Sequence, residues 1–113
     1  MIEIKIPLRL YSLQNALKGH WRERAALAKT QRQIAHWSCK EQATTAGMTG
    51  PLTITITRYA PRRLDSDNLA ISAKFVRDGI ADFLGRDDGD PMLNWQYTQE
   101  PSKGYAVRVR IEA

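Results

Sequence analysis

Carboxylates gather at the two ends of one segment of this chain. They are Asp65 and Asp67 at its start, and Asp87, Asp88 and Asp90 at its end. Two side chains at positions i and i+2 of an extended chain point the same way, and two carboxylates so placed repel each other unless a cation lies between them. Mg²⁺ prefers carboxylate and water oxygens, so the first pair suits that ion. The alternative is that Asp67 or Ser66 caps the following helix and Asp65 is a solvated turn residue.

The second acidic group has its own simpler interpretation, because Asp, Gly and Pro favour surface turns. Neither group follows the ligand pattern of an EF-hand loop. A straight helix of about 17 residues between the groups would hold them ~25 Å apart. For Asp88 to share an ion with the first pair, the chain must turn back, the helix must be shorter or bent, or a second copy must complete the site.

A lysine follows the first pair at helical spacing. Lys74 lies seven residues after Asp67, which brings the two within ~20° of one helix face, two turns apart. A lysine near a metal-bound phosphate stabilises developing negative charge. The alternative is a surface lysine that faces Asp78 at i+4.

Hydrophobic periodicity predicts six elements that must position these residues. Alternation of period two predicts strands, and a 3-4 spacing with strong helix formers predicts helices. The predicted strands are 2–8, 51–59, 93–99 and 105–111, and the predicted helices are about 21–45 and 68–84. The order β-α-β-α-β-β predicts an α/β fold of the α+β kind, a small mixed sheet with helices packed on it. A chain of 113 residues suits a single domain over 1–113.

The composition restricts the class of partner and the compartment. The formal net charge of +5 favours a polyanionic partner, nucleic acid first. No apolar run approaches the ~20 residues of a membrane span, and the first residues do not read as a signal peptide. The single cysteine, Cys39, fits a reducing cytoplasm. We expect Cys39 to be a small buried residue rather than a nucleophile.

Several stretches together resemble a known nuclease family. They are the entry "DSDNL", the tail "RDGIADFLG", the loop "DDGDP" and the basic stretch "NALKGHWRERAALAK". In these motifs the chain is similar to the RusA-type Holliday junction resolvases, especially those encoded by phages. The similarity covers most of the chain. In the family pattern the lysine comes four residues after the second aspartate, where this chain has Ile71.

The resemblance implies a homodimeric, Mg²⁺-dependent endonuclease of DNA recombination and repair, with Mn²⁺ as a possible substitute. Such an enzyme cuts four-way DNA junctions by paired incisions in the cytoplasm of a bacterium or a phage-infected host. By motif, three aspartates would bind the metal, and a lysine would join them in catalysis: Asp65, Asp67, Asp88 and Lys74. Whether Asp87 or Asp90 replaces Asp88 as a ligand stays open.

Basic and aromatic residues near the acidic segment are candidates for DNA contact. They are Lys18, His20, Trp21, Arg22, Arg24, Arg62 and Arg63. Such cations neutralise phosphates, and Trp21 could stack on an exposed base or anchor its own helix in the core. Three rival functions remain: a DNA-binding dimer without catalysis, a nuclease for branched DNA of broader specificity, and a small structural phage component.

Overall fold

The computed structural model describes residues 1–11, 21–44 and 48–113, and the side chain of Trp21 is not among the described groups. Lys18 and His20 lie outside the described residues. The elements in chain order are β1 (Ile2–Ile6), α2 (Trp21–Gln42), β2 (Leu52–Ala60), α3 (Ser66–Ser72), α4 (Lys74–Leu84), β3 (Leu93–Pro101) and β4 (Ala106–Glu112). The predicted mixed sheet with packed helices is confirmed.

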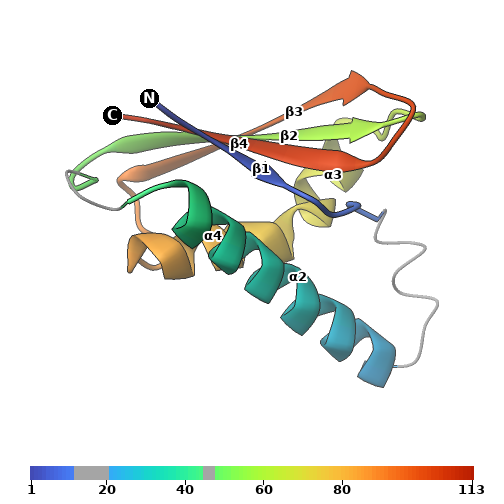
Figure 1. Ribbon diagram of the computed structural model, residues 1–113, viewed down its shortest axis with the longest axis horizontal. Helices are drawn as coiled ribbons and strands as arrows, with labels where there is room; N and C mark the ends of the chain where they lie inside the picture. The colour runs from blue at the N-terminus through green and yellow to red at the C-terminus, as the bar shows by residue number, and fades with distance from the viewer. Residues whose placement is uncertain (12–20, 45–47) are drawn as a thin grey trace.

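The four strands form one mixed sheet in the order β1-β4-β2-β3. β4 pairs antiparallel with β1 and with β2, while β2 and β3 are parallel. A parallel pair needs a crossover connection, and α3 and α4 supply it. Figure 1 shows the helices on one side of the sheet, below it in that view. The crossover therefore carries the acidic segment from the end of β2 to the start of β3.

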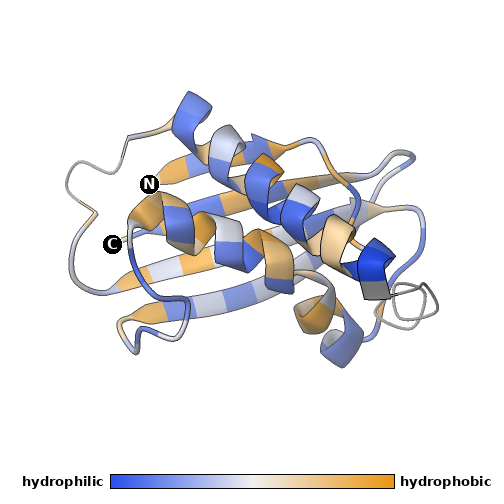
Figure 2. Cartoon of the chain, turned by 90° about the horizontal axis from the view of Figure 1, so that it is seen from below, coloured by the Kyte–Doolittle hydropathy of each residue, from blue (hydrophilic) through white to orange (hydrophobic). Residues whose placement is uncertain are grey.

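The core lies between the sheet and the helices. Alternate residues of β2, such as Ile54 and Ile56, point inward and are buried, as are Val76 and Ile80 of α4. In Figure 2 both long helices lie across this face of the sheet. Cys39 of α2 is fully buried in the same cluster, as expected. The strand alternation read from the sequence thus identifies the inner face correctly.

The prediction of one continuous helix over 68–84 is wrong. The chain forms α3 and α4 with a break at Ala73, whose backbone has φ −91° and ψ 0°. The buried hydroxyl of Ser72 donates to the carbonyl oxygen of Leu69 at 2.7 Å. A serine that bonds back to its own helix competes with the backbone ladder and bends the helix. The helical angle computed from Asp67 to Lys74 therefore does not hold, and Lys74 is instead the exposed first residue of α4.

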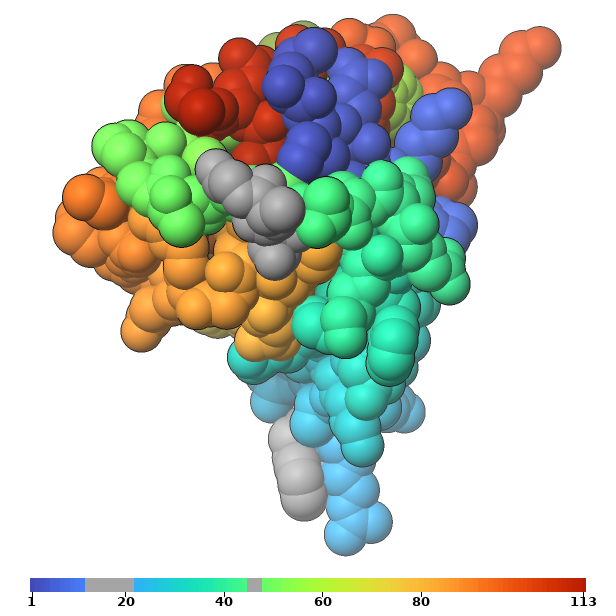
Figure 3. All heavy atoms as spheres, turned by 60° about the vertical axis from the view of Figure 1, so that its left-hand side comes forward, coloured from blue at the N-terminus to red at the C-terminus, as the bar shows by residue number. Residues whose placement is uncertain are grey.

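α2 and α4 cross at a glycine. A Cβ atom on Gly79 would collide with the carbonyl oxygen of Arg32 and would lie 2.8 Å from the Cβ of Ala35. Beside this crossing, the guanidinium of Arg32 bonds both carboxylate oxygens of Asp82, at 2.6 and 2.8 Å. The N-terminal half of α2 extends past the rest of the molecule, as Figure 3 shows in light blue.

The last residue of α2 covers part of one sheet edge. The side chain of Gln42 accepts from the backbone N–H of Lys5 at 2.8 Å and donates to the carbonyl of Lys5 at 2.7 Å. The amide of Gln42 thus imitates a neighbouring strand at the outer edge of β1. The outer edge of β3 is the other end of the strand order.

Candidate active site

Asp65 caps α3. Its Oδ1 accepts from the backbone N–H of Asn68 at 2.9 Å, and its Oδ2 accepts from the side-chain amide of Asn68 at 3.0 Å. The alternative that Asp67 or Ser66 caps the helix and Asp65 is a solvated turn residue is therefore wrong, because Asp65 is itself the cap. Asp67 is exposed in the first turn of α3. Because a carboxylate offers about four lone-pair sites, Asp65 keeps acceptor capacity beyond its capping bonds.

A glutamine of β3 holds the chain that leads into Asp65. The side chain of Gln99 accepts from the N–H of Leu64 at 2.9 Å and donates to its carbonyl at 2.6 Å. Asp65 borders a cavity of about 420 Å³ that Arg63 and Tyr97 also line. The start of the acidic segment is thus fixed to the C-terminal end of β3.

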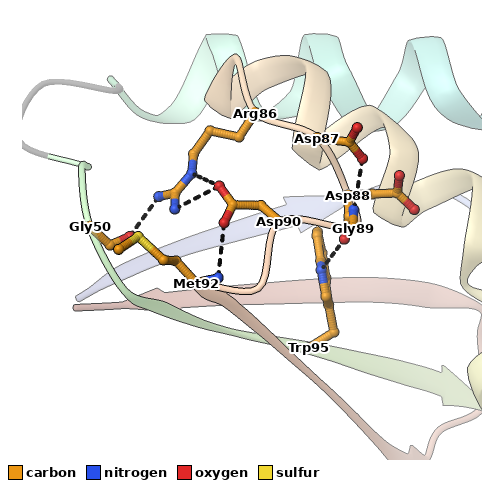
Figure 4. A network of polar contacts seen from close by, with 8 residues as sticks. All are labelled: Gly50, Arg86, Asp87, Asp88, Gly89, Asp90, Met92 and Trp95. Carbon is orange, nitrogen blue, oxygen red and sulfur yellow. Dashed lines mark hydrogen bonds and ion pairs between the residues drawn. The ribbon is translucent and has the colours of Figure 1, made fainter.

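The loop after α4 is built around Asp90, as Figure 4 shows. The carboxylate of Asp90 accepts from the N–H of Met92 at 2.9 Å and pairs with Arg86 at 3.1 Å. The N–H of Met92 is the main cause that lowers the pKa of Asp90. Arg86 also donates to the carbonyl of Gly50 at 2.7 Å, which ties the loop to the start of β2. Asp90 therefore stabilises the turn.

The neighbouring aspartates are less engaged. Asp87 accepts one bond, from the N–H of Gly89 at 2.9 Å. Asp87 and Asp88 border a polar hollow of about 270 Å³ together with Asp78 and Asp82. Because the carboxylate of Asp90 has more bonds than those of Asp87 and Asp88, these contacts favour Asp88 or Asp87 over Asp90 as a metal ligand.

Asp88 is held by α4 and β3 together. Its carbonyl accepts from Arg77 at 2.9 Å and from the indole N–H of Trp95 at 3.0 Å. Its carboxylate lies 3.5 Å from Nε of Arg77. The guanidinium of Arg77 also lies 4.9 Å from the Trp95 ring centroid and donates to the hydroxyl of Tyr97 at 3.1 Å. Arg77 is not among the site residues predicted from the sequence, although Trp95 and Tyr97, alternate residues of one strand face, were a usable signal.

The two acidic groups lie at opposite ends of β3 within one protomer. Asp88 is bonded at Trp95, and the chain before Asp65 is bonded at Gln99. At ~3.3 Å per residue, these positions on β3 are about 13 Å apart. Among the described residues, no three His, Cys, Asp or Glu side chains are close enough together to hold one metal ion. Among the described residues, Asp88 is therefore not grouped with Asp65 and Asp67 in one cluster of ligands.

The basic residues fall in two places around these acids. Arg22 and Arg24 are exposed on the projecting start of α2. Arg62 and Arg63 are exposed just before Leu64, next to the acidic segment. Both pairs are accessible to a large polyanion.

No helix in the described ranges is long and apolar enough to cross a membrane. A donor set of exposed carboxylates fits a hard divalent cation, and neither Asp65 nor Asp67 forms an ion pair in the described part of the chain.

In comparisons with known proteins, no family model matches this chain and no curated protein sequence matches it significantly.

Proposed function

We propose that this chain is a Mg²⁺-dependent endonuclease that resolves four-way DNA junctions as a homodimer. The observation that carries the proposal is the placement of an acidic group at each end of β3, with Asp88 fixed at Trp95 and Asp65 fixed near Gln99. The resemblance of these segments to the RusA-type resolvases supports the same function. The exposed arginines on both sides supply the charge that a DNA substrate needs.

A second copy of the chain would bring the acidic groups together. β3 lies at one edge of the sheet, so its outer side is open to pairing with another strand. When two β3 strands pair antiparallel about a two-fold axis at Tyr97, the Trp95 end of each lies beside the Gln99 end of the other, about 4.8 Å away. Asp88 of each subunit then approaches Asp65 and Asp67 of its partner, and the dimer has two such sites.

Two metal sites related by a two-fold axis suit paired incisions on two DNA strands. Bound Mg²⁺ supplies polarisation of a phosphoryl oxygen and activation of a water molecule. The carboxylates of Asp65, Asp67 and Asp88 would hold the ion. Lys74, at the exposed start of α4, adds positive charge where the transition state becomes more negative. This assignment of roles uses no histidine or cysteine nucleophile.

Incubation with a synthetic four-way junction tests the function. We expect symmetric nicks on two strands in Mg²⁺ and no nicks with chelator. Asp67→Asn should abolish cutting, whereas Glu112→Gln, on an exposed residue of β4, should leave it unchanged. Fork and linear duplex substrates separate a junction resolvase from a broader branched-DNA nuclease. DNA binding without any cutting would instead favour the inactive dimer.

Mixing two inactive variants tests whether the site is shared between subunits. In a heterodimer of Asp67→Asn and Asp88→Asn chains, one shared site carries both changes and the other carries neither. The mixture should therefore regain nicking of a single strand, while each variant alone stays inactive. No recovery after denaturing and refolding the two together would show that the carboxylates do not act across the subunits.

A further inference from the structure

A buried arginine in β2 has no acidic partner. Arg58 is 6% exposed and points inward among the core residues of the sheet. Its Nη1 donates to the carbonyl of Arg62 at 2.7 Å, and its Nε lies 3.5 Å from the carbonyl of Leu10. No carboxylate in the described part of the chain lies within ion-pair distance of it. The guanidinium therefore belongs to a largely buried side chain whose hydrogen bonds in the described part of the chain go to carbonyl oxygens.

This arrangement is costly for the protein on its own. Burial lowers the pKa of Arg58, and the nearby charge of Arg9 acts in the same direction. An arginine nevertheless stays protonated at all ordinary pH values, so the charge remains. A buried charge is normally paired, because its removal from water costs free energy that an opposite charge offsets. An anion at this position would supply the missing charge.

Arg58 borders a small cavity that two further arginines line. The cavity measures about 180 Å³, and its walls include Arg62, Arg63 and Gln99. It is smaller than the roughly 300–1,000 Å³ typical of sites for drug-sized molecules. Glu100 also lines it and is exposed, so the arginines outnumber the single carboxylate. The size and the charge suit a compact anion such as a phosphate group.

The cavity lies directly beside the candidate active site. Arg63 and Gln99 line both this cavity and the larger one that Asp65 borders. The cavity beside Arg58 therefore adjoins the cavity that Asp65 borders. Two phosphates near each other along one DNA strand could occupy the two cavities together.

We propose that Arg58, Arg62 and Arg63 form a pocket for a backbone phosphate of DNA, next to the phosphate at Asp65. The identity of the ligand as DNA rests on the proposed function, whereas the chemistry of the pocket selects phosphate from any source. Arg58 supplies a fixed, desolvated charge, and the two exposed arginines close around the anion. Such a contact positions the strand without reading its sequence.

Inorganic phosphate is the first probe, with the full chain. Phosphate should raise the melting temperature in a saturable way, compared with chloride at equal ionic strength. The rise should disappear in the double variant Arg62→Gln/Arg63→Gln, whose changes are at exposed positions that the fold tolerates. The matched control is Arg108→Gln/Arg110→Gln on β4. Arg58→Lys keeps the charge and Arg58→Met removes it, so the first should retain part of the effect.

Binding of a four-way junction in chelator, where no cutting occurs, is the second probe. Each lost phosphate contact should reduce the slope of log K against log salt by about 0.9. Arg58→Met should lose about one contact, and the Arg108→Gln/Arg110→Gln control should lose none. If phosphate stabilises the protein but the slopes are unchanged, the pocket does not serve DNA. If neither the melting temperature responds to phosphate nor the salt slope changes, the role of Arg58 is only to bond the carbonyls of Leu10 and Arg62 to β2. A changed slope together with no nuclease activity would support the phosphate pocket and would reject the proposed nuclease function.

Discussion

Arg77 holds Asp88 through both the backbone and the side chain of the aspartate. Its Nη2 donates to the Asp88 carbonyl at 2.9 Å, and its Nε lies 3.5 Å from the carboxylate. Since Nε is buried and makes no hydrogen bond, the ion pair is its main contact. Arg77 thus contributes both to the position of the loop after α4 and to the direction in which the Asp88 carboxylate faces.

Replacing Arg77 should therefore affect stability and metal use together. Arg77→Leu leaves the Tyr97 hydroxyl without this donor and the Asp88 carbonyl with Trp95 alone, so we expect a loss of about 1–3 kcal/mol. Urea unfolding measures this loss. The Mg²⁺ concentration for half-maximal cutting should rise as well. The control Tyr97→Phe keeps the Asp88 contacts, so its Mg²⁺ concentration for half-maximal cutting should not change. An equal rise of this concentration in Tyr97→Phe would argue against a positioning role for Arg77.

The contribution of Asp65 as a helix cap and the contribution of its negative charge can be tested separately. Asparagine caps helices about as well as aspartate, so Asp65→Asn should leave the free energy of unfolding within about 0.5 kcal/mol of the wild type without metal. Asp65→Ala should cost ~1 kcal/mol. Both variants should lose the Mg²⁺-dependent rise in melting temperature and the cutting activity. A full Mg²⁺ response in Asp65→Asn would remove Asp65 from the metal site.

The helix crossing at Gly79 predicts a sensitive position. Gly79→Ala places a methyl group against the carbonyl of Arg32 and the side chain of Ala35, so α4 must shift away from α2. Overpacking of this kind costs roughly 1–3 kcal/mol. Thermal unfolding should show a lower melting temperature, and Gly104→Ala, where a Cβ meets nothing within 4 Å, is the control. Equal stability of Gly79→Ala and wild type would contradict the close crossing.

The ion pair between α2 and α4 predicts a weak pH dependence. The hydrogen bond from Arg32 lowers the pKa of Asp82 below its unfolded value. Its contribution is therefore complete above the unfolded pKa of ~3.9 and is lost as the pH falls through the lower folded pKa. Both side chains are partly exposed, so the pair should contribute less than ~1 kcal/mol. The stability difference between wild type and Asp82→Asn, from urea unfolding, should shrink from pH 6 to pH 2. A stability difference that grows as the pH falls would contradict the lowered pKa of Asp82.

The thiol of Cys39 should be unreactive in the folded protein. Burial raises its pKa to about 12, and the side chain has no exposed surface. The thiolate is the reactive form, so a disulfide reagent at pH 8 should label the native protein only as fast as it unfolds. In urea one thiol per chain should react at once. Rapid labelling of the native protein would show that α2 opens from the sheet.

The strands and the inner face of the sheet could be predicted because their signal is local. The alternation in 51–59 depends only on neighbouring residues, and β2 differs from it by one residue at each end. The break at Ala73 could not be predicted in the same way. Its cause is one hydroxyl, that of Ser72, which bonds Leu69 instead of solvent. Hydrophobic spacing does not register such a bond.

The candidate site could likewise be predicted from the sequence only in part. Its acidic residues stand out by type and spacing, whereas the groups that hold them come from distant parts of the chain. Gln99 reaches Leu64 and Arg77 reaches Tyr97 only because the crossover lays α3 and α4 along β3. Arg58 looks like an ordinary strand cation in the sequence, and its burial follows from its inward register in β2. Partners of this kind need the topology before they can be assigned.

The amide of Gln42 also affects how many copies can assemble. A sheet with two bare edges can template the addition of strands on both sides, and such growth has no natural end. At β1 Gln42 already bonds the N–H and the carbonyl of Lys5, so these two groups are not available to an incoming strand. In the proposed homodimer, strand addition would take place at the β3 side, where the edges of two copies would bond to each other. Assembly through the sheet would then stop at a closed pair and would not proceed to a fibre.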